Sequence, residues 1–123
     1  MQAARRWTRH ALTSAHAEAA AHRLNFAVNR AYYACFYAAS AVLLSAGHRF
    51  VKHTGVRAAL HQHFVKTGRI APELGRSYDL LFQRRGQADY AELVTFDDSQ
   101  VAELVRKAEE FVGAMERLLS PEI

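Results

Sequence analysis

The sequence contains little proline, cysteine or glycine, and each shortage narrows the possible folds. Of 123 residues, two are proline, one is cysteine and six are isolated glycines. The single cysteine, Cys35, cannot form an internal disulfide, so nothing in the cysteine content indicates secretion. No stretch alternates apolar and polar residues as a strand would, and proline rarely interrupts the chain. We therefore expect nearly all of the chain to be helical.

The sequence also lacks the short motifs of common enzyme classes. It has no glycine-rich phosphate loop, no Gly-x-Ser-x-Gly elbow and no His-Glu-x-x-His zinc motif. Its seven histidines do not compensate, because His61 and His63 are two residues apart and would point to different sides of a helix. These absences exclude conventional hydrolases and nucleotide-binding folds, and we expect neither a metal nor a cofactor.

Acidic residues are nearly absent from the first half of the chain. Residues 1–69 hold ten Lys or Arg and one acid, Glu18, for a net charge of +9, whereas residues 70–123 hold six Lys or Arg and eleven acids, for −5. Two interpretations are open. The halves of a bundle could attract each other, or the first helices could form a basic surface for a polyanion.

No segment has the pattern of a signal peptide or a membrane span. After the basic start, His10, His16 and Glu18 would interrupt the apolar core of a signal peptide. The uncharged run over residues 31–47 reaches the lower length limit of about 17 residues for a span, but its Ala, Ser and Tyr content favours insertion little. We expect a cytoplasmic protein without membrane contact.

The most informative segment that is present is the apolar stretch from Asn25 to Leu44. Small and aromatic side chains surround its helical circumference, which predicts a helix buried in a bundle or partly against another subunit. With half of its residues hydrophobic, the chain is long enough for one core, and we expect a single domain over residues 1–123. The expected fold class is all-α, an antiparallel up-and-down bundle of four to five helices.

Periodicity and capping signals predict five helices. The first two cover about residues 3–20, with Trp7, Leu12 and Ala15 as apolar positions, and about residues 24–46, ended by Gly47 in the left-handed conformation. The others are a short helix capped by Thr54 and ended by Gly68, a helix with Pro72 in its first turn, and a helix with Asp97 as N-cap and Gln100 three residues later.

Polar residues are embedded among the apolar ones in two helices. Asn25, Asn29, Arg30, Tyr33 and Tyr37 share one side of the second helix, and Arg84, Arg85, Asp89 and Tyr90 end the fourth. A buried arginine needs acceptors, and Asp89 could pair with Arg30 or Arg85. These residues could form an internal salt-bridge network, or a polar cleft whose arginines bind phosphate and whose tyrosines stack on bases.

The order of several blocks resembles the HEPN domain family (higher eukaryotes and prokaryotes nucleotide-binding). The blocks, which lie between about Leu24 and Leu118, are Asn29-Arg30-Ala31-Tyr32-Tyr33-Ala34, Gly47, Lys52-His53-Thr54-Gly55-Val56, Phe64-Val65-Lys66-Thr67-Gly68 and Arg85-x3-Asp89-Tyr90. The resemblance implies an all-α bundle that is commonly dimeric and often encoded beside a minimal nucleotidyltransferase. It also implies that many relatives are toxins that cleave RNA.

One position departs from the family pattern. RNA-cleaving members carry Arg, four to six residues and then His near the end of the fourth helix, where this sequence reads Arg84-Arg85-Gly86-Gln87-Ala88-Asp89-Tyr90. No histidine follows His63. Imidazole suits proton transfer at neutral pH, whereas aspartate is a poor acid there. The catalytic residues are therefore undetermined, with Arg85 and Asp89 as candidates.

The leading hypothesis is a non-catalytic HEPN-like domain that binds nucleotide or RNA phosphates. The resemblance to the family implies a polar site in this sequence, made of Arg30, Tyr33, Lys52, His53, Arg84, Arg85 and Tyr90. The domain would act as a homodimer or with a minimal nucleotidyltransferase partner, in a two-component system of the toxin–antitoxin type. One alternative is an RNA endonuclease toxin in which Asp89 replaces the histidine. Another is a pure protein-interaction module.

Overall fold

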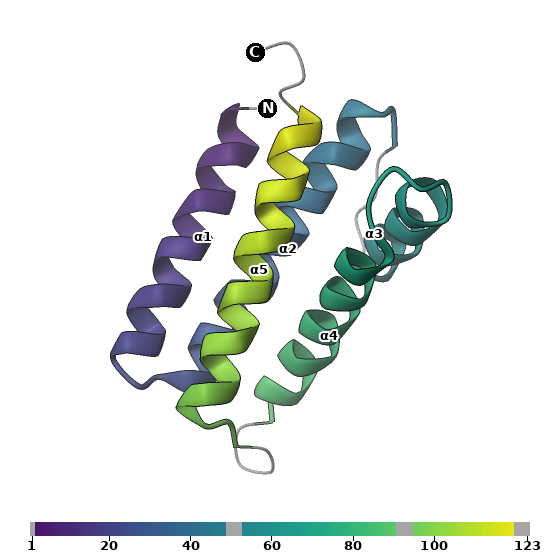
Figure 1. Ribbon diagram of the computed structural model, residues 1–123. Helices are drawn as coiled ribbons and strands as arrows, with labels where there is room; N and C mark the ends of the chain where they lie inside the picture. The colour runs from purple at the N-terminus through teal and green to yellow at the C-terminus, as the bar shows by residue number, and fades with distance from the viewer. Residues whose placement is uncertain (1, 49–52, 91–94, 120–123) are drawn as a thin grey trace.

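The computed structural model describes residues 2–48, 53–90 and 95–119, and every regular element in these ranges is a helix. The elements are α1 (Gln2–Ala20), α2 (Leu24–Ser45), α3 (His53–Leu60), the π-helical η1 (His61–Val65), α4 (Pro72–Ala88) and α5 (Asp98–Leu119). Helices α1, α2 and α5 run alongside one another, α4 packs beside α2 and α5, and α3 lies beside α4 (Figure 1). The predicted all-α bundle is confirmed.

Helix α2 is the central element of the bundle. It contacts α1, α3, α4 and α5, and 11 of its 22 residues are buried, six of them alanines that let neighbouring helices approach closely. The prediction of a buried apolar helix is correct for most of its circumference. One line of residues, the α2 strip, stays partly or largely exposed at alternating steps of four and three: Phe26, Arg30, Tyr33, Tyr37, Ser40 and Leu44.

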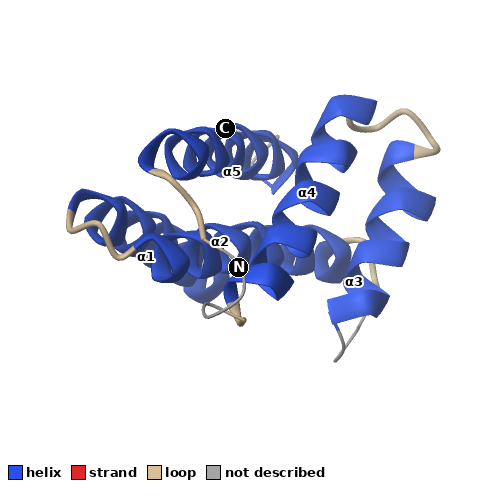
Figure 2. Ribbon diagram, turned by 90° about the horizontal axis from the view of Figure 1, so that it is seen from below, coloured by secondary structure: helices blue, strands red, loops and turns tan. Residues whose placement is uncertain are grey.

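Figure 2 shows α1 and α2 side by side, with α5 on one side of this pair. Of the three apolar positions named in the first helix, Leu12 and Ala15 are buried and Trp7 is 61 % exposed. Residues on one face of a helix are three or four positions apart, and Trp7 lies five positions before Leu12, so its side chain is not on the buried face. None of the described helices is long and apolar enough to cross a membrane.

The helix ends largely follow the predicted local signals. Gly47 and Gly68 have φ values of +93° and +79°, in the left-handed region that glycine adopts readily after a helix. Pro72 occupies the first turn of α4. At the start of α5 the backbone N–H of Gln100 donates to Asp97 Oδ1 at 2.7 Å, and the backbone N–H of Asp97 donates to Gln100 Oε1 at 2.9 Å. This reciprocal pair is the predicted capping box.

The third helix differs from its prediction in two places. Helix α3 begins at His53, so Thr54 lies in its first turn instead of at the cap position. After Leu60 the helix widens into η1, where the backbone N–H of Lys66 donates to the carbonyl oxygen of His61, five residues back, at 2.8 Å. A π turn inserts an extra residue and re-aims the side chains around it. The apolar periodicity did not indicate this insertion.

The pairing of α1 with α5 bears on the uneven charge of the two halves. Arg9 pairs with Glu116, His16 with Glu109, and His22 Nδ1 lies 3.1 Å from Asp98 Oδ1. These contacts support the interpretation in which the two halves attract each other. Part of the basic surplus of the first half, at Arg9, is therefore balanced by Glu116 at the surface between α1 and α5, and the site below depends on other cations.

Candidate functional site

Two of the predicted arginines, Arg30 and Arg85, meet Tyr33 where the end of α4 packs against the first half of α2. Asn25 Nδ2 donates to the carbonyl oxygen of Ala88 at 3.1 Å, which holds the two helices together at this point. The guanidinium carbon of Arg85 lies 5.7 Å from the centre of the Tyr33 ring, and that of Arg30 lies 6.0 Å from it. Two cations from different helices thus contact one aromatic ring, within the range of cation–π attraction.

We call Arg30, Tyr33, Arg85 and Asp89 the arginine–tyrosine cluster. Arg85 is its inner cation, with a side chain only 27 % exposed. Its Nη2 donates to the Tyr33 hydroxyl at 3.4 Å, and its Nε is buried and makes no hydrogen bond to any described residue. Asp89 Oδ2 lies 3.8 Å from that Nε, close enough for an ion pair but too far for a hydrogen bond. Arg85 is therefore incompletely partnered, which is costly for a buried charged donor.

Arg30 differs from Arg85 because no carboxylate within the described ranges pairs with it. Asp89 was a candidate partner for either arginine, and the structure places it beside Arg85. The guanidinium of Arg30 instead packs on the ring of Tyr33. The cluster thus holds two arginines and one acid whose side chain is 50 % exposed. Its net charge is positive, which favours an anionic ligand.

Tyr32 supports this cluster from the core. It is fully buried and meets the Tyr33 ring at 5.3 Å and 71°, and Arg85 lies 5.6 Å from its centre. Burial raises the pKa of the Tyr32 hydroxyl to about 12, an effect that contact with Tyr78 and the charge of Arg85 partly offset. Tyr32 is therefore uncharged at neutral pH, and it positions Arg85 and Tyr33 by packing.

Of the other predicted site residues, Arg84 and Tyr90 lie outside this cluster. Arg84 Nη1 donates to Gln87 Oε1 within α4 at 3.1 Å, and Tyr90 is 65 % exposed in the turn that follows α4. His53 is the first residue of α3, but its side chain, like the whole of Lys52, lies outside the described residues. The structure thus brings together Arg30, Tyr33, Arg85 and Asp89 of the residues named from the sequence.

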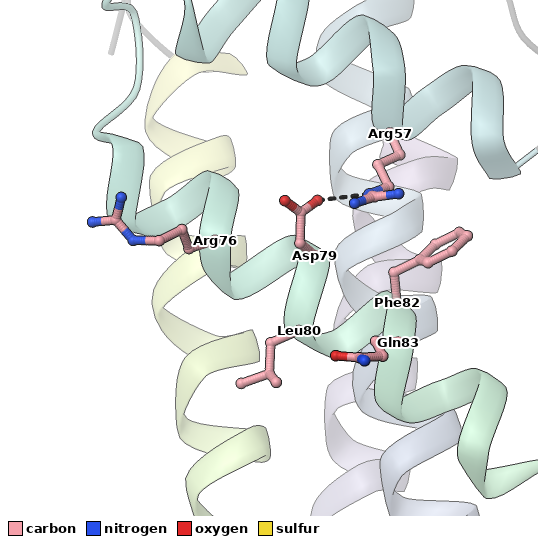
Figure 3. Close-up of a pocket in the computed structure, with 6 residues that line it drawn as sticks. All are labelled: Arg57, Arg76, Asp79, Leu80, Phe82 and Gln83. Carbon is pink, nitrogen blue, oxygen red and sulfur yellow. Dashed lines mark hydrogen bonds and ion pairs between the residues drawn. The ribbon is translucent and has the colours of Figure 1, made fainter.

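A second polar cluster, which the sequence analysis did not single out, joins α3 and η1 to α4 (Figure 3). Asp79 Oδ1 accepts a hydrogen bond from Arg57 Nε at 2.7 Å and lies 2.9 Å from His61 Nε2. Partial burial works to raise the pKa of the Asp79 carboxyl, but the hydrogen bonds and positive charges of Arg57 and His61 outweigh burial and lower it. Arg57 also lies 5.2 Å from the centre of the Phe82 ring.

A cleft of about 550 Å³ opens beside this second cluster. It is lined by Arg57, Arg76, Asp79, Leu80, Phe82 and Gln83. In Figure 3 the carboxylate of Asp79 points toward Arg57, and Arg76 points away from both. Arg57 and His61 are four residues apart, a spacing that places them on one helical face, but spacing cannot show that their shared acid comes from α4. Because Asp79 pairs with both cations, we assign this cluster to the packing of α3 and η1 on α4.

The described residues hold neither a cluster of metal ligands nor an activated thiol. No three His, Cys, Asp or Glu side chains within them come together as a metal site requires. Cys35 is fully buried, and burial raises the pKa of its thiol, so the reactive thiolate is disfavoured.

Comparison with known proteins confirms the family resemblance found in the sequence. A family profile described as "HEPN domain" matches residues 1–118. The chain is 50% identical to "UPF0332 protein" of Thermotoga maritima over 97 residues, which cover 79% of this chain and 74% of the relative. It is also similar to "Putative toxin MJ0142" of Methanocaldococcus jannaschii, at 30% identity over 77% of this chain and 65% of the relative. "Putative toxin MJ0605" of the same organism is 34% identical, over 76% of this chain and 69% of the relative.

Proposed function

The chain belongs to the HEPN domain family, and from this premise we propose that its arginine–tyrosine cluster binds the phosphates of a nucleotide or RNA. The observation that carries the proposal is that Arg30 and Arg85 both contact Tyr33, and that among the described residues Asp89, at 3.8 Å from Arg85, is the one acid that pairs with either arginine. A phosphate offers charged acceptor oxygens to planar guanidinium groups, and the half-buried ring offers a surface for a base. The proposed role is binding without cleavage.

We further propose that the protein works in a system of the toxin–antitoxin type, because two relatives carry the word toxin in their names. A minimal nucleotidyltransferase is the partner that the family resemblance implies. In such a pair the phosphate-binding cluster would be the part of this chain that contacts RNA or a nucleotide carried by the partner.

The proposal is tested by replacing each arginine with a neutral side chain of similar shape. Arg85→Gln and Arg30→Gln should each weaken binding of a labelled oligoribonucleotide by about tenfold or more, because each removes a charge-assisted contact. The slope of the logarithm of the binding constant against the logarithm of the salt concentration should also decrease in magnitude by about one in each variant, because each loses one phosphate contact. Fluorescence anisotropy at low and moderate salt measures both quantities.

Arg106→Gln is the matched control, because Arg106 lies on α5 and pairs with Glu103 and Glu110. It should leave the affinity for RNA unchanged, and circular dichroism should show all three variants folded. Wild-type affinity in both cluster variants would contradict the proposal. Degradation of the RNA by the wild type but not by Asp89→Asn would instead identify an endonuclease that uses Asp89.

A second candidate function, protein interaction, is favoured by the exposed ends of the α2 strip. Phe26 is 61 % exposed and Leu44 is 48 % exposed, and large apolar side chains along one helix face often mark an interface. We propose a second copy of this chain as the occupant in that case. A dimeric mass by light scattering that becomes monomeric in Leu44→Glu, but not in Ala102→Glu on α5, would support it. A monomeric wild type would contradict it.

A further inference from the structure

We propose that the arginine–tyrosine cluster continues into a stacking track for single-stranded RNA, formed by Tyr33, Tyr37 and Trp7. In this arrangement Arg30 and Arg85 bind phosphates, and the indole of Trp7 stacks on a base further along the same strand. The inference rests on the proposed function and specifies its ligand as an oligonucleotide strand instead of a single nucleotide.

The track is continuous in the structure. The guanidinium carbon of Arg85 lies 5.7 Å from the centre of the Tyr33 ring, the centres of Tyr33 and Tyr37 are 5.9 Å apart, and those of Tyr37 and Trp7 are 6.0 Å apart. Tyr33 and Tyr37 are one helical turn apart on the α2 strip, and Trp7 comes from the neighbouring helix α1. Two further rings therefore extend the surface beyond the one that the arginines contact.

Trp7 is held in place without being covered. Its ring meets that of Tyr37 at 63°, so the two do not stack flat, and 61 % of Trp7 remains exposed. Tyr33 and Tyr37 are only half-buried. Aromatic faces beside arginines are the arrangement with which proteins hold unpaired bases and the backbone next to them, and here both arginines lie at the Tyr33 end of the track.

The charge of the strip favours RNA over a second copy of the chain. A symmetric dimer would place the same patch of both copies at one interface, so Arg30 and Arg85 of each copy would be brought close together. Among the described residues Asp89 alone pairs with these arginines in each copy, and desolvating the unbalanced charge would oppose association. A polyanionic strand neutralises the same arginines and offers bases to the rings.

The extent of the track favours a strand over a mononucleotide. A single nucleotide could use Arg85 and the adjacent Tyr33, but Trp7 lies beyond Tyr37, two ring-to-ring steps from Tyr33. Engaging both ends at once requires several nucleotides. The track therefore discriminates ligands by length, whereas the arginines alone would not.

Trp7 is the only tryptophan, so its fluorescence reports directly on the track. We would titrate the protein with oligouridylate of about ten nucleotides, and separately with an abasic phosphate chain of equal length that has charge but no bases. The expected result is saturable quenching of Trp7 emission by oligouridylate, with the same midpoint as binding measured by anisotropy, and binding of the abasic chain without comparable quenching.

Trp7→Ala should weaken binding of oligouridylate at least about fivefold and leave binding of the abasic chain unchanged, since stacking is lost and charge is kept. Thr13→Ala is the control, because Thr13 is an exposed residue of α1 that belongs neither to the track nor to the α2 strip. It should bind both probes like the wild type.

Three results would overturn the inference. Oligouridylate binding that depends on Arg85 but leaves Trp7 emission and the affinity of Trp7→Ala unchanged would remove the track and keep the proposed phosphate site. Failure of both probes to bind would remove the phosphate site and the track together. A shift of Trp7 emission with protein concentration in the absence of RNA would show that a second copy covers the indole.

Discussion

At the level of single residues, Arg57 and Arg85 each lie near an aspartate, but the two pairs differ in geometry. Arg57 donates its Nε to Asp79 at 2.7 Å, whereas the Nε of Arg85 is 3.8 Å from Asp89. The first distance is that of a closed, charge-assisted hydrogen bond and the second is not. The carboxylate of Asp79 therefore holds Arg57 in a closed pair, whereas Asp89 leaves the buried Nε of Arg85 without a hydrogen-bond partner among the described residues.

Asp79→Asn should lower the free energy of unfolding by about 1–2 kcal/mol at neutral pH, because the amide weakens the contacts with Arg57 and His61. The pKa of Asp79 is lower in the folded protein than in the unfolded chain. Its stabilising contribution is thus complete above the unfolded pKa of about 4 and is lost as the pH falls through the folded pKa. The difference between variant and wild type should shrink in acid.

Urea denaturation between neutral and strongly acidic pH measures this difference. Glu110→Gln removes a carboxylate that is 58 % exposed and pairs with Arg106, so it should change stability by less than about 0.5 kcal/mol. A difference for Asp79→Asn that stayed constant with pH would show that ionisation of Asp79 does not contribute.

At the scale of elements, the junction of η1 with α4 depends on one glycine. A Cβ at Gly75 would lie 2.9 Å from both His61 Cε1 and Val65 Cγ2, closer than such atoms approach in proteins. The π turn carries His61 and Val65 toward α4, and the contact of His61 with Asp79 limits how far the ring can retreat. The absence of a side chain at position 75 therefore permits the close packing of the two elements.

Gly75→Ala should lower the free energy of unfolding by about 1–2 kcal/mol, because the overlap outweighs the better helix propensity of alanine. Gly86→Ala lies in the same helix with no atom within 4 Å of the added Cβ, and should raise stability by up to about 1 kcal/mol. Chemical denaturation of the pair measures both changes. Stabilisation by both substitutions would show that η1 moves away from α4 at no cost.

The sequence predicted the features that depend on neighbouring residues. The five helices, the capping box of Asp97 and Gln100 and the left-handed Gly47 all follow from local patterns. The π turn, the sharing of Asp79 and the exposure of Trp7 were not predicted. Each depends on which helices meet and on how each helix is rotated, and the spacing of residues within one helix does not contain that information.

The same limit applies to the candidate site. The three- and four-residue steps in α2 correctly placed Arg30 and Tyr33 on one side of the helix, and the position of Arg85 near the end of α4 suggested a meeting point. The sequence could not decide which arginine Asp89 would pair with. The contact that extends the cluster to α1 could not be predicted either, because Trp7 and Tyr37 are thirty positions apart in the sequence and belong to different helices.

At the scale of the whole molecule, opposite charges join the first helix to the last. The contact of Arg9 with Glu116 links residues 107 positions apart, and His16 and His22 meet acids of α5 in the same way. Exposed pairs of this kind contribute little stability individually. Their value here is orientation, since they match one side of α1 with one side of α5 and oppose other arrangements of the helices.

This pairing has a consequence for biosynthesis. Residues 1–69 carry a net charge of +9, and the acid that pairs with Arg9 lies in α5, so a nascent segment of these residues is a polycation until the acidic residues 70–123 follow. Contacts that close such distant parts of a chain form late. Before α5 is made, this segment can bind the polyanionic surface of the ribosome, and α5 then supplies acids that compete for it.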